Sequence, residues 1–247
     1  MVDETGASAT ISVVIVTLNE EKNLQGLFDN LRAQTDRRFD LLIIDGGSMD
    51  GTNALVRMAG DLVTYYVSER DSGIYDALNK AVRAVRTEFY LVLGADDRLA
   101  PDAIANYRAA SANADIVMAG VRAGKQLRQG CRPELAWIGP SRAITSHSVG
   151  TLIRSALHEK FGAYSFRYPV LADWHFIKRA LSSPQTRIVS GEFIAGEFCV
   201  IGASNRNFTR TLCELWMVQR ETGENLLVQY LLFQARLLCH LGKVLTA

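Results

Sequence analysis

Two adjacent carboxylates, Asp96 and Asp97, follow a short apolar run at residues 89–93, Phe-Tyr-Leu-Val-Leu. The run is short and carries aromatic and β-branched residues, which is typical of a buried strand in a parallel sheet. Open α/β sheets bind ligands just beyond the carboxyl ends of their strands, where these carboxylates are expected. Neighbouring carboxylates repel each other unless a cation lies close, and a hard divalent cation is the simplest candidate. The alternative is a polar turn in which Asp97 caps a helix beginning near Pro101.

Polar side chains also follow the three strands predicted earlier in the chain, at residues 11–16, 39–44 and 62–67. They are Thr17, Asn19 and Glu20 after the first strand, Asp45 after the second, and Glu69, Arg70 and Asp71 after the third. The carboxyl ends of parallel strands meet at one edge of a sheet, so we expect these loops to build a single polar crevice. Asn19 is also a candidate cap for the helix that follows it.

Helices are predicted between these strands. The first carries Leu24, Leu27, Phe28 and Leu31 at i, i+3, i+4, i+7 spacing, the second covers residues 53–59, and the third has an apolar stripe of Ile74, Ala77, Leu78, Ala81, Val82 and Val85. Strand and helix therefore alternate with short links. This alternation predicts right-handed βαβ units and an α/β fold with a mostly parallel sheet that is covered on both faces.

The glycine-rich turn after the second strand does not indicate a dinucleotide site. Gly46, Gly47 and Gly51 do not form a GxGxxG pattern, and the turn has neither the lysine nor the hydroxyl of a phosphate-binding P-loop. A dinucleotide fingerprint would also follow the first strand, where this chain has Thr-Leu-Asn-Glu. We therefore expect Gly47 and Gly51 to supply positive φ angles for a turn.

Composition indicates one substantial domain. The chain has 247 residues, is 48% hydrophobic, and has 27 Lys+Arg against 26 Asp+Glu, so no large net charge recruits nucleic acid. Four scattered cysteines without CxxC spacing predict reduced thiols in a cytoplasmic protein. Residues 1–10 lack a signal-peptide pattern, and there is no uninterrupted apolar run of about 18 residues, so no transmembrane helix is expected.

Four segments together resemble the family 2 glycosyltransferases of the GT-A fold. They are Ile-Val-Thr-Leu-Asn-Glu-Glu (15–21), Ile-Ile-Asp-Gly-Gly-Ser-Met-Asp-Gly-Thr (43–52), Ser-Glu-Arg-Asp-Ser-Gly-Ile-Tyr-Asp-Ala-Leu-Asn-Lys-Ala (68–81) and Leu-Gly-Ala-Asp-Asp (93–97). Any one segment is a weak signal, but the set in this order is highly specific. The third resembles the subgroup that builds bacterial surface polysaccharides and O-antigen-type glycans. The resemblance implies a Rossmann-like GT-A fold with C-terminal helices.

The resemblance also implies roles for individual residues. Nucleotide-sugar binding would fall to Thr17, Leu18, Asn19, Glu20, Asp45, Arg70, Asp71, Gly73, Asn79 and Asp96. Among these, Thr17 and Asn19 would border the base and Asp45 would accept a hydrogen bond from the pyrimidine ring. Asp97 would ligate Mn2+ or Mg2+ bridging the diphosphate. His147 would contact the metal or diphosphate or line the acceptor cleft, although a lone histidine can equally be structural.

Asp173 is the candidate catalytic base. It lies in Val-Leu-Ala-Asp-Trp-His-Phe, which resembles the family segment that ends in an acidic residue before a helix. It would take the proton of an acceptor hydroxyl as that oxygen attacks the anomeric carbon, with inversion at that carbon. Asp173 is equally a candidate N-cap for a helix over residues 174–181, and both roles are compatible.

The acceptor side is less patterned. Residues 121–137 carry Arg122, Lys125, Arg128 and Arg132, which suit either docking of an acidic lipid-linked phosphate or a plain exposed hairpin. We expect a domain over residues 1–204, with a nucleotide-sugar half at 10–100 and an acceptor half at 101–204. A helical extension over residues 205–247 follows, and its last helix would pack on the domain, dimerise or lie at a membrane interface.

These observations predict a metal-dependent inverting glycosyltransferase that uses a nucleotide-diphosphate sugar, UDP-linked in the first instance. The acceptor would be a glycan or a polyprenyl-linked molecule, and the enzyme would be cytoplasmic, with possible contact to the inner membrane surface. A nucleotidyltransferase and a non-catalytic nucleotide-sugar-binding protein are the alternatives. The first is disfavoured because residues 17–20 are not the glycine-rich, basic loop that triphosphate binding needs.

Overall fold

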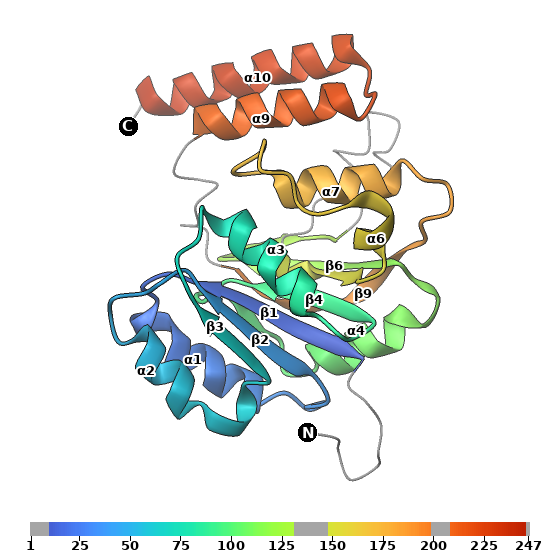
Figure 1. Ribbon diagram of the computed structural model, residues 1–247. Coiled ribbons are helices and arrows are strands. Elements are labelled where there is room, and N and C mark those ends of the chain that lie inside the picture. The colour runs from blue at the N-terminus through green and yellow to red at the C-terminus, as the bar shows by residue number, and fades with distance from the viewer. Residues whose placement is uncertain (1–9, 131–147, 199–207, 246–247) are drawn as a thin grey trace.

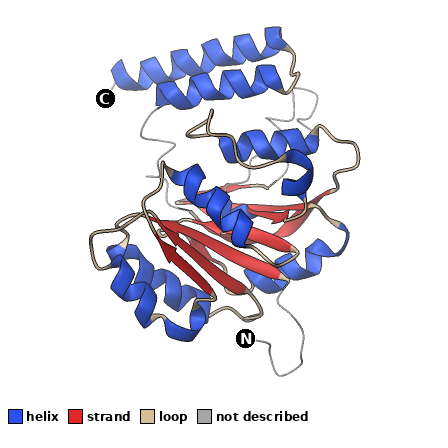
Figure 2. Ribbon diagram, in the orientation of Figure 1, coloured by secondary structure: helices blue, strands red, loops and turns tan. Residues whose placement is uncertain are grey.

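The computed structural model describes residues 10–130, 148–198 and 208–245 (Figure 1). One mixed sheet of nine strands runs through the molecule, and helices cover both of its faces (Figure 2). Two helices near the C-terminus form a separate layer beyond it.

The first half of the chain forms four parallel strands in the order β3-β2-β1-β4. The strands are β1 (Ile11–Thr17), β2 (Asp40–Asp45), β3 (Tyr65–Ser68) and β4 (Phe89–Leu93), and the linking helices are α1 (Glu21–Arg32), α2 (Thr52–Met58) and α3 (Ile74–Ala84). This arrangement confirms the predicted βαβ units. It also brings the carboxyl ends of all four strands to one edge of the sheet.

The apolar spacing read from the sequence matches the buried face of α1 but only part of that of α3. Leu24, Leu27, Phe28 and Leu31 are all buried in α1. In α3, by contrast, Ile74 is half exposed and Tyr75 is buried in its place. The Tyr75 hydroxyl lies within hydrogen-bond distance of Val170 and Asp173, whereas Ile74 is the first residue of the helix.

The second half extends the sheet in the order β4-β8-β6-β9-β5, with β7 paired to β6. The strands are β5 (Arg98–Leu99), β6 (Ile116–Ala123), β7 (Gln126–Arg128), β8 (Thr151–Arg154) and β9 (Ile188–Glu197), and the helices are α4 (Ala103–Ala110), α6 (Leu157–Phe161) and α7 (Ala172–Leu181). β8 is antiparallel to both β4 and β6, so this half is mixed. β9 is one continuous strand and pairs in parallel with β6.

Two apolar clusters cover the two faces of the sheet. Alternate residues of β1 show the division, because Val13 and Ile15 pack towards α1 and α4 whereas Val14 packs towards α3 and α7. A strand that is buried on both faces needs apolar residues throughout, which explains the continuous apolar runs in the sequence.

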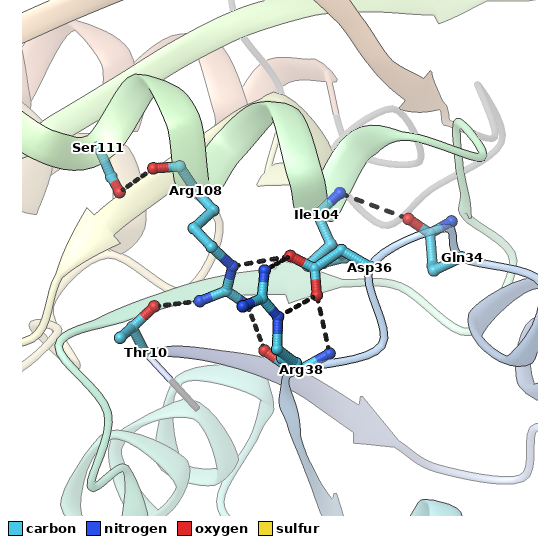
Figure 3. A network of polar contacts seen from close by, with 7 residues as sticks. All are labelled: Thr10, Gln34, Asp36, Arg38, Ile104, Arg108 and Ser111. Carbon is cyan, nitrogen blue, oxygen red and sulfur yellow. Dashed lines mark hydrogen bonds and ion pairs between the residues drawn. The ribbon is translucent and has the colours of Figure 1, made fainter. Parts of the chain in front are cut away.

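An ion-pair network fixes the amino-terminal end of the sheet to α4 (Figure 3). Asp36, in the link between α1 and β2, accepts hydrogen bonds from Arg108 Nε at 2.8 Å and Arg38 Nε at 3.0 Å. Arg108 also donates to Thr10 and to the Arg38 carbonyl. Burial raises the pKa of Asp36, but the hydrogen bonds from the two arginines outweigh it and hold the pKa well below its ordinary value.

The C-terminal helices α9 (Phe208–Glu221) and α10 (Leu226–Leu245) pack against each other through Trp216, whose ring meets Tyr230 and Phe233 edge-on. In Figure 1 this pair lies on the side of α7 away from the sheet. Lys178 of α7 and Glu224 of the α9–α10 turn form a buried ion pair that joins the pair to the domain. None of the helices in the described ranges is long and apolar enough to span a bilayer.

Candidate functional site

Three polar residues lie side by side at the carboxyl edge of the parallel strands. Thr17 of β1 is in register with Asp45 of β2, which is in turn in register with Ser68 of β3. Leu93, the last residue of β4, pairs with Ile15 of β1, so the Asp96–Asp97 turn leaves the sheet at the same edge. The structure thus brings together the loops that the sequence predicted would converge.

Asp45 is the anchor of this edge. Its Oδ1 accepts hydrogen bonds from the hydroxyls of Thr17 and Ser48, and its Oδ2 accepts from Ser68 Oγ at 2.6 Å and from the Gly47 and Ser48 amides at 3.1 and 2.9 Å. Burial raises its pKa, but the hydrogen bonds from Ser48 and Ser68 outweigh burial and lower it. The carboxylate is buried and both oxygens bind the protein's own donors, so its evident task is to hold the turn in shape.

Asn19 joins the loop after β1 to the loop after β2. Its backbone amide donates a hydrogen bond to Ser48 Oγ at 2.7 Å, and its side-chain Oδ1 accepts one from the Met49 backbone amide at 2.9 Å. The next amide, that of Glu20, donates to Thr52 Oγ1 at 2.8 Å. Asn19 has a φ of 57°, a left-handed conformation that asparagine tolerates better than most residues. The predicted helix cap is wrong, because Asn19 precedes the cap position, which Glu20 occupies, and its side chain binds the neighbouring loop instead.

The glycines of the second loop serve different purposes. Gly47 has a φ of +86°, as predicted. Gly51 has an ordinary φ of −69°, so the prediction of a positive φ there is wrong. Its amide donates a hydrogen bond to Oε2 of the exposed Glu21 side chain at 3.0 Å. A Cβ on Gly46 would lie 2.5 Å from Oδ2 of Asp71, which shows that the loop after β3 packs directly onto this turn.

The loop after β3 places Arg70 and Asp71 beside the glycine turn. Asp71 Oδ1 accepts a hydrogen bond from the Gly73 amide at 2.9 Å, and Gly73 itself has a φ of +122° that favours glycine. Arg70 is exposed and its Cγ lies near Gly47. Leu18, on the loop after β1, is also more than half exposed. Both side chains therefore remain accessible to a ligand at this edge.

Asp96 and Asp97 converge on Gly94. If Gly94 carried a Cβ, that atom would lie 2.9 Å from Asp96 Oδ1 and 3.0 Å from Asp97 Oδ2. Asp97 is buried and its Oδ2 accepts the Gly94 amide at 2.8 Å, whereas Asp96 is exposed. The alternative that Asp97 caps the next helix is wrong, because Asp102 occupies the cap position of α4.

This pair fits a divalent cation that is shared with a ligand. Mg2+ and similar ions are commonly held by one or two carboxylates, with substrate phosphates and water completing the shell. Among the described residues, no group of three or more His, Cys, Asp or Glu side chains is arranged to hold a metal by itself. His147, the other predicted metal residue, lies outside the described residues.

Asp173 lies in the first turn of α7 and faces α3. Its Oδ1 lies 2.7 Å from the Tyr75 hydroxyl and 2.8 Å from the Trp174 amide. Leu171 occupies the cap position of α7, so Asp173 is not the N-cap. Burial raises the pKa of Asp173, and the hydrogen bonds from Tyr75 and Trp174 offset this only in part. Both of these contacts fall on Oδ1, so Oδ2 is the candidate oxygen for accepting a proton.

A cavity of about 310 Å3 opens beside Asp173 between α3, β4, β8, α7 and α9. Asp173 is the one carboxylate among the described residues that line it. A larger hollow of about 570 Å3 lies beside the edge strand β3. Glu69 from the predicted polar loops lines it, but none of the residues with an expected binding or catalytic role does. The cavity at Asp173 therefore fits the candidate site better.

Asn79 does not lie at the site. Its side chain is 2% exposed, and both of its ends bind the backbone of Tyr164, whose amide donates to Oδ1 and whose carbonyl accepts from Nδ2. Asn79 therefore ties α3 to the segment before α7. A direct contact with a nucleotide sugar is wrong for this residue, because its amide is buried and satisfied.

Sequence reasoning missed Tyr75, Ser48, Ser68 and Glu214. Ser48, three residues after Asp45, and Tyr75, at the start of the third apolar helix stripe, had positions in the sequence that were usable signals. Ser68 is 23 residues from Asp45 and meets it only because β2 pairs with β3. Glu214 lies on α9 and accepts hydrogen bonds from the Val170 and Leu171 amides at 2.9 and 3.0 Å. No local pattern in the sequence indicates that contact.

In a comparison with known protein families, residues 12–166 match the model of the family "Glycosyl transferase family 2". The PGL/p-HBAD biosynthesis glycosyltransferase of Mycobacterium tuberculosis (strain ATCC 25177 / H37Ra) is 33% identical over 186 residues, which cover 72% of each chain.

Solved structures share the fold at lower identity. The mannosyltransferase PcManGT of Pyrobaculum calidifontis, in complex with GDP-Man and Mn2+, matches with a TM-score of 0.67 at 20% identity over 87% of this chain and 64% of that one. Glucosyl-3-phosphoglycerate synthase of M. tuberculosis, in complex with Mn2+, UDP and glucosyl-3-phosphoglycerate, matches with a TM-score of 0.63 at 16% identity over 88% of this chain and 81% of that one.

Proposed function

Because this chain belongs to glycosyl transferase family 2 and is a glycosyltransferase with the predicted α/β GT-A fold, we propose that it is a metal-dependent, inverting enzyme. Its donor would be a nucleotide-diphosphate sugar, with UDP as the first nucleotide to test. Its acceptor would be a hydroxyl of a glycan or lipid-linked molecule in cell-surface polysaccharide synthesis. One observation carries the proposal: the Asp96–Asp97 pair follows β4, and the same strand, through Val92, lines the apolar cavity that contains Asp173.

The donor would bind along the carboxyl edge of β1, β2 and β4. The loops joined by the hydrogen bonds of Asn19 and Asp45 would form the floor of this site, and the exposed side chains of Leu18 and Arg70 would contact the base and the diphosphate. Asp96 and Asp97 would hold Mn2+ or Mg2+ at Gly94. When bound, such a cation offsets the negative charge that develops on the departing nucleoside diphosphate.

Asp173 would act as the general base. Its Oδ2 would take the proton of the acceptor hydroxyl while that oxygen forms a bond to the anomeric carbon. The bond from that carbon to the diphosphate oxygen breaks, and its electron pair leaves with the diphosphate. Attack from the face opposite the leaving group gives inversion. A pKa raised by burial makes the carboxylate a stronger proton acceptor once it is ionised.

Thermal shift measurements with UDP and GDP, each with and without Mn2+, test the donor site. A nucleotide present at 100 times its Kd would raise Tm by roughly 5 to 10 °C, and we expect this shift to require the metal. Sugar transfer from the bound donor would then be lost in Asp173→Asn while the nucleotide-dependent shift persists. Equal shifts with and without metal, or full transfer by Asp173→Asn, would contradict the assigned roles.

The two alternatives predict different outcomes. A nucleotidyltransferase would release pyrophosphate from a nucleoside triphosphate and a sugar phosphate, and a non-catalytic binding protein would bind UDP with manganese but turn nothing over. The loop after β1 argues against the first, because it holds Asn19 and Glu20 in place of the glycines and basic residues that a triphosphate needs.

The proposed partners include the cytoplasmic face of a membrane or a second copy of the chain. Along α10, the side chains of Leu227, Leu231 and Leu238 are all more than half exposed on one face. Such a stripe suits either an interfacial helix or a dimer contact. Sedimentation with anionic vesicles and size-exclusion chromatography of the wild-type chain would separate these two possibilities.

A further inference from the structure

The cavity beside Asp173 has a predominantly apolar lining. Its apolar side chains include Leu78, Val92, Ile153, Trp174, Ile177 and Leu215. Val92, Trp174 and Leu215 are only partly buried, so part of their apolar surface remains open to the cavity. Polar atoms come chiefly from Ser148, Thr151 and Thr211. Concave sites of this type bind ligands through apolar contact, with a few polar groups fixing orientation.

We propose that this cavity is a subsite for an apolar group of the acceptor, a ring or a short hydrocarbon chain attached next to the reacting hydroxyl. The inference rests on the proposed function, because it takes Asp173 as the base at the mouth of the cavity. A volume of about 310 Å3 is at the small end of the range for ligand pockets, which is roughly 300 to 1,000 Å3. It suits a group of modest size rather than a whole oligosaccharide, which would need many more polar partners.

Helix α9 supplies one wall of this subsite, through Thr211 and Leu215. Residue 214 lies between them on the helix and points to the segment that leads into α7: Glu214 Oε2 accepts the amides of Val170 and Leu171. Val170 and Leu171 themselves line the cavity. Glu214, which holds the segment before α7 in place, is thus adjacent on α9 to the residues that line the cavity.

A buried ion pair also holds α9 against α7, at the end of α9 that leads into α10. Lys178 and Glu224 are each 1% exposed at the side chain and form an ion pair between α7 and the turn after α9. Burial lowers the pKa of Lys178, and the hydrogen bond and charge of Glu224 oppose that effect. Removing one partner of such a pair is strongly destabilising, so α9 cannot leave α7 without a large loss. The match to the family model ends at residue 166, so this wall lies beyond it.

Binding of n-alkyl β-D-glucosides, from methyl to octyl and below their micelle concentrations, tests the subsite in the presence of UDP and Mn2+. We expect the affinity, measured by titration calorimetry, to rise about two- to fourfold for each added methylene until the cavity is filled. In Leu215→Asn, the ratio of octyl to methyl affinity should fall at least tenfold. This ratio does not depend on the fraction of protein that is folded.

Leu226→Asn is the matched control, since it makes the same change at a half-exposed position of α10 outside the Leu227–Leu231–Leu238 stripe and should keep the wild-type ratio. A flat series in the wild-type chain would overturn the subsite, as would loss of the series in Leu226→Asn with retention in Leu215→Asn. If UDP raised Tm only in the presence of metal but the alkyl glucosides all bound with the same affinity, the subsite would be excluded and the proposed function would be retained. A steep series in a chain that transfers sugar to no alkyl glucoside or other hydroxyl acceptor would show that the occupant is not an acceptor.

Discussion

The hydroxyl of Tyr75 lies 2.7 Å from Oδ1 of Asp173, across 98 residues of sequence. Tyr75 is in the first turn of α3, directly after the loop that carries Arg70 and Asp71, whereas Asp173 begins α7. The same hydroxyl lies 2.8 Å from the Val170 carbonyl, and its single proton can serve only one of the two acceptors at a time. This contact connects the donor loop to the proposed base.

We predict that Tyr75→Phe shifts the acid limb of the pH–rate profile to higher pH. The hydrogen bond from Tyr75 lowers the pKa of Asp173, so its loss raises that pKa further. The base must be ionised to act, and a higher pKa therefore moves the rise in kcat upwards in pH. Tyr65→Phe, at a half-exposed phenol on β3, is the control and should leave the profile unchanged. An unshifted profile in Tyr75→Phe would show that Tyr75 does not position Asp173.

Asp97→Asn should lower sugar transfer by about 100-fold or more, because it weakens the hold on a cation that stabilises the leaving group. We also expect a higher Mn2+ concentration to be needed for the UDP-dependent rise in Tm. Asp61→Asn, an exposed carboxylate before β3, should behave as the wild type in both measurements. An unchanged Mn2+ dependence in Asp97→Asn would exclude Asp97 as a ligand.

Gly46→Ala should reduce stability by about 1 to 3 kcal/mol in urea unfolding, because the new methyl group would overlap the Asp71 carboxylate. The double variant with Asp71→Ala removes the clash, so the two changes should not add. UDP binding should be weaker than in the wild type in both variants, because Gly46→Ala displaces the Asp71 carboxylate and the double variant removes it, and Asp71 belongs to the proposed donor loop. Additive losses of stability would show that the two residues do not meet.

Asp36→Asn tests the network of Figure 3. The folded-state pKa of Asp36 is lowered, so its contribution is complete above the unfolded pKa of about 3.9 and disappears as pH falls below it. At pH 7 we expect the variant to be about 1 to 3 kcal/mol less stable than the wild type, and the gap to narrow between pH 5 and 3. Urea unfolding across this range measures it. If the difference in unfolding free energy between the variant and the wild type did not change with pH, the charge of the carboxylate would contribute nothing to stability.

The sequence by itself determined the parallel half of the fold and the ends of its strands. Continuous apolar runs can only be buried strands when helical stripes such as Leu24 to Leu31 alternate with them, because each element must hide its apolar surface against the next. The positions of Asp45 and of the Asp96–Asp97 pair followed from that alternation. These features repeat over a few residues, so local spacing is enough to reveal them.

Only the tertiary structure decided which polar groups meet. Asp45 turns out to be held by Ser68, Asn79 binds Tyr164, and Glu214 of α9 holds the amides that precede α7. The Gly51 amide donates a hydrogen bond to Glu21 of α1. Such contacts join residues that are distant in the chain. A hydrogen bond or a close approach between such residues produces no periodic pattern in the sequence, so only the folded structure reveals it.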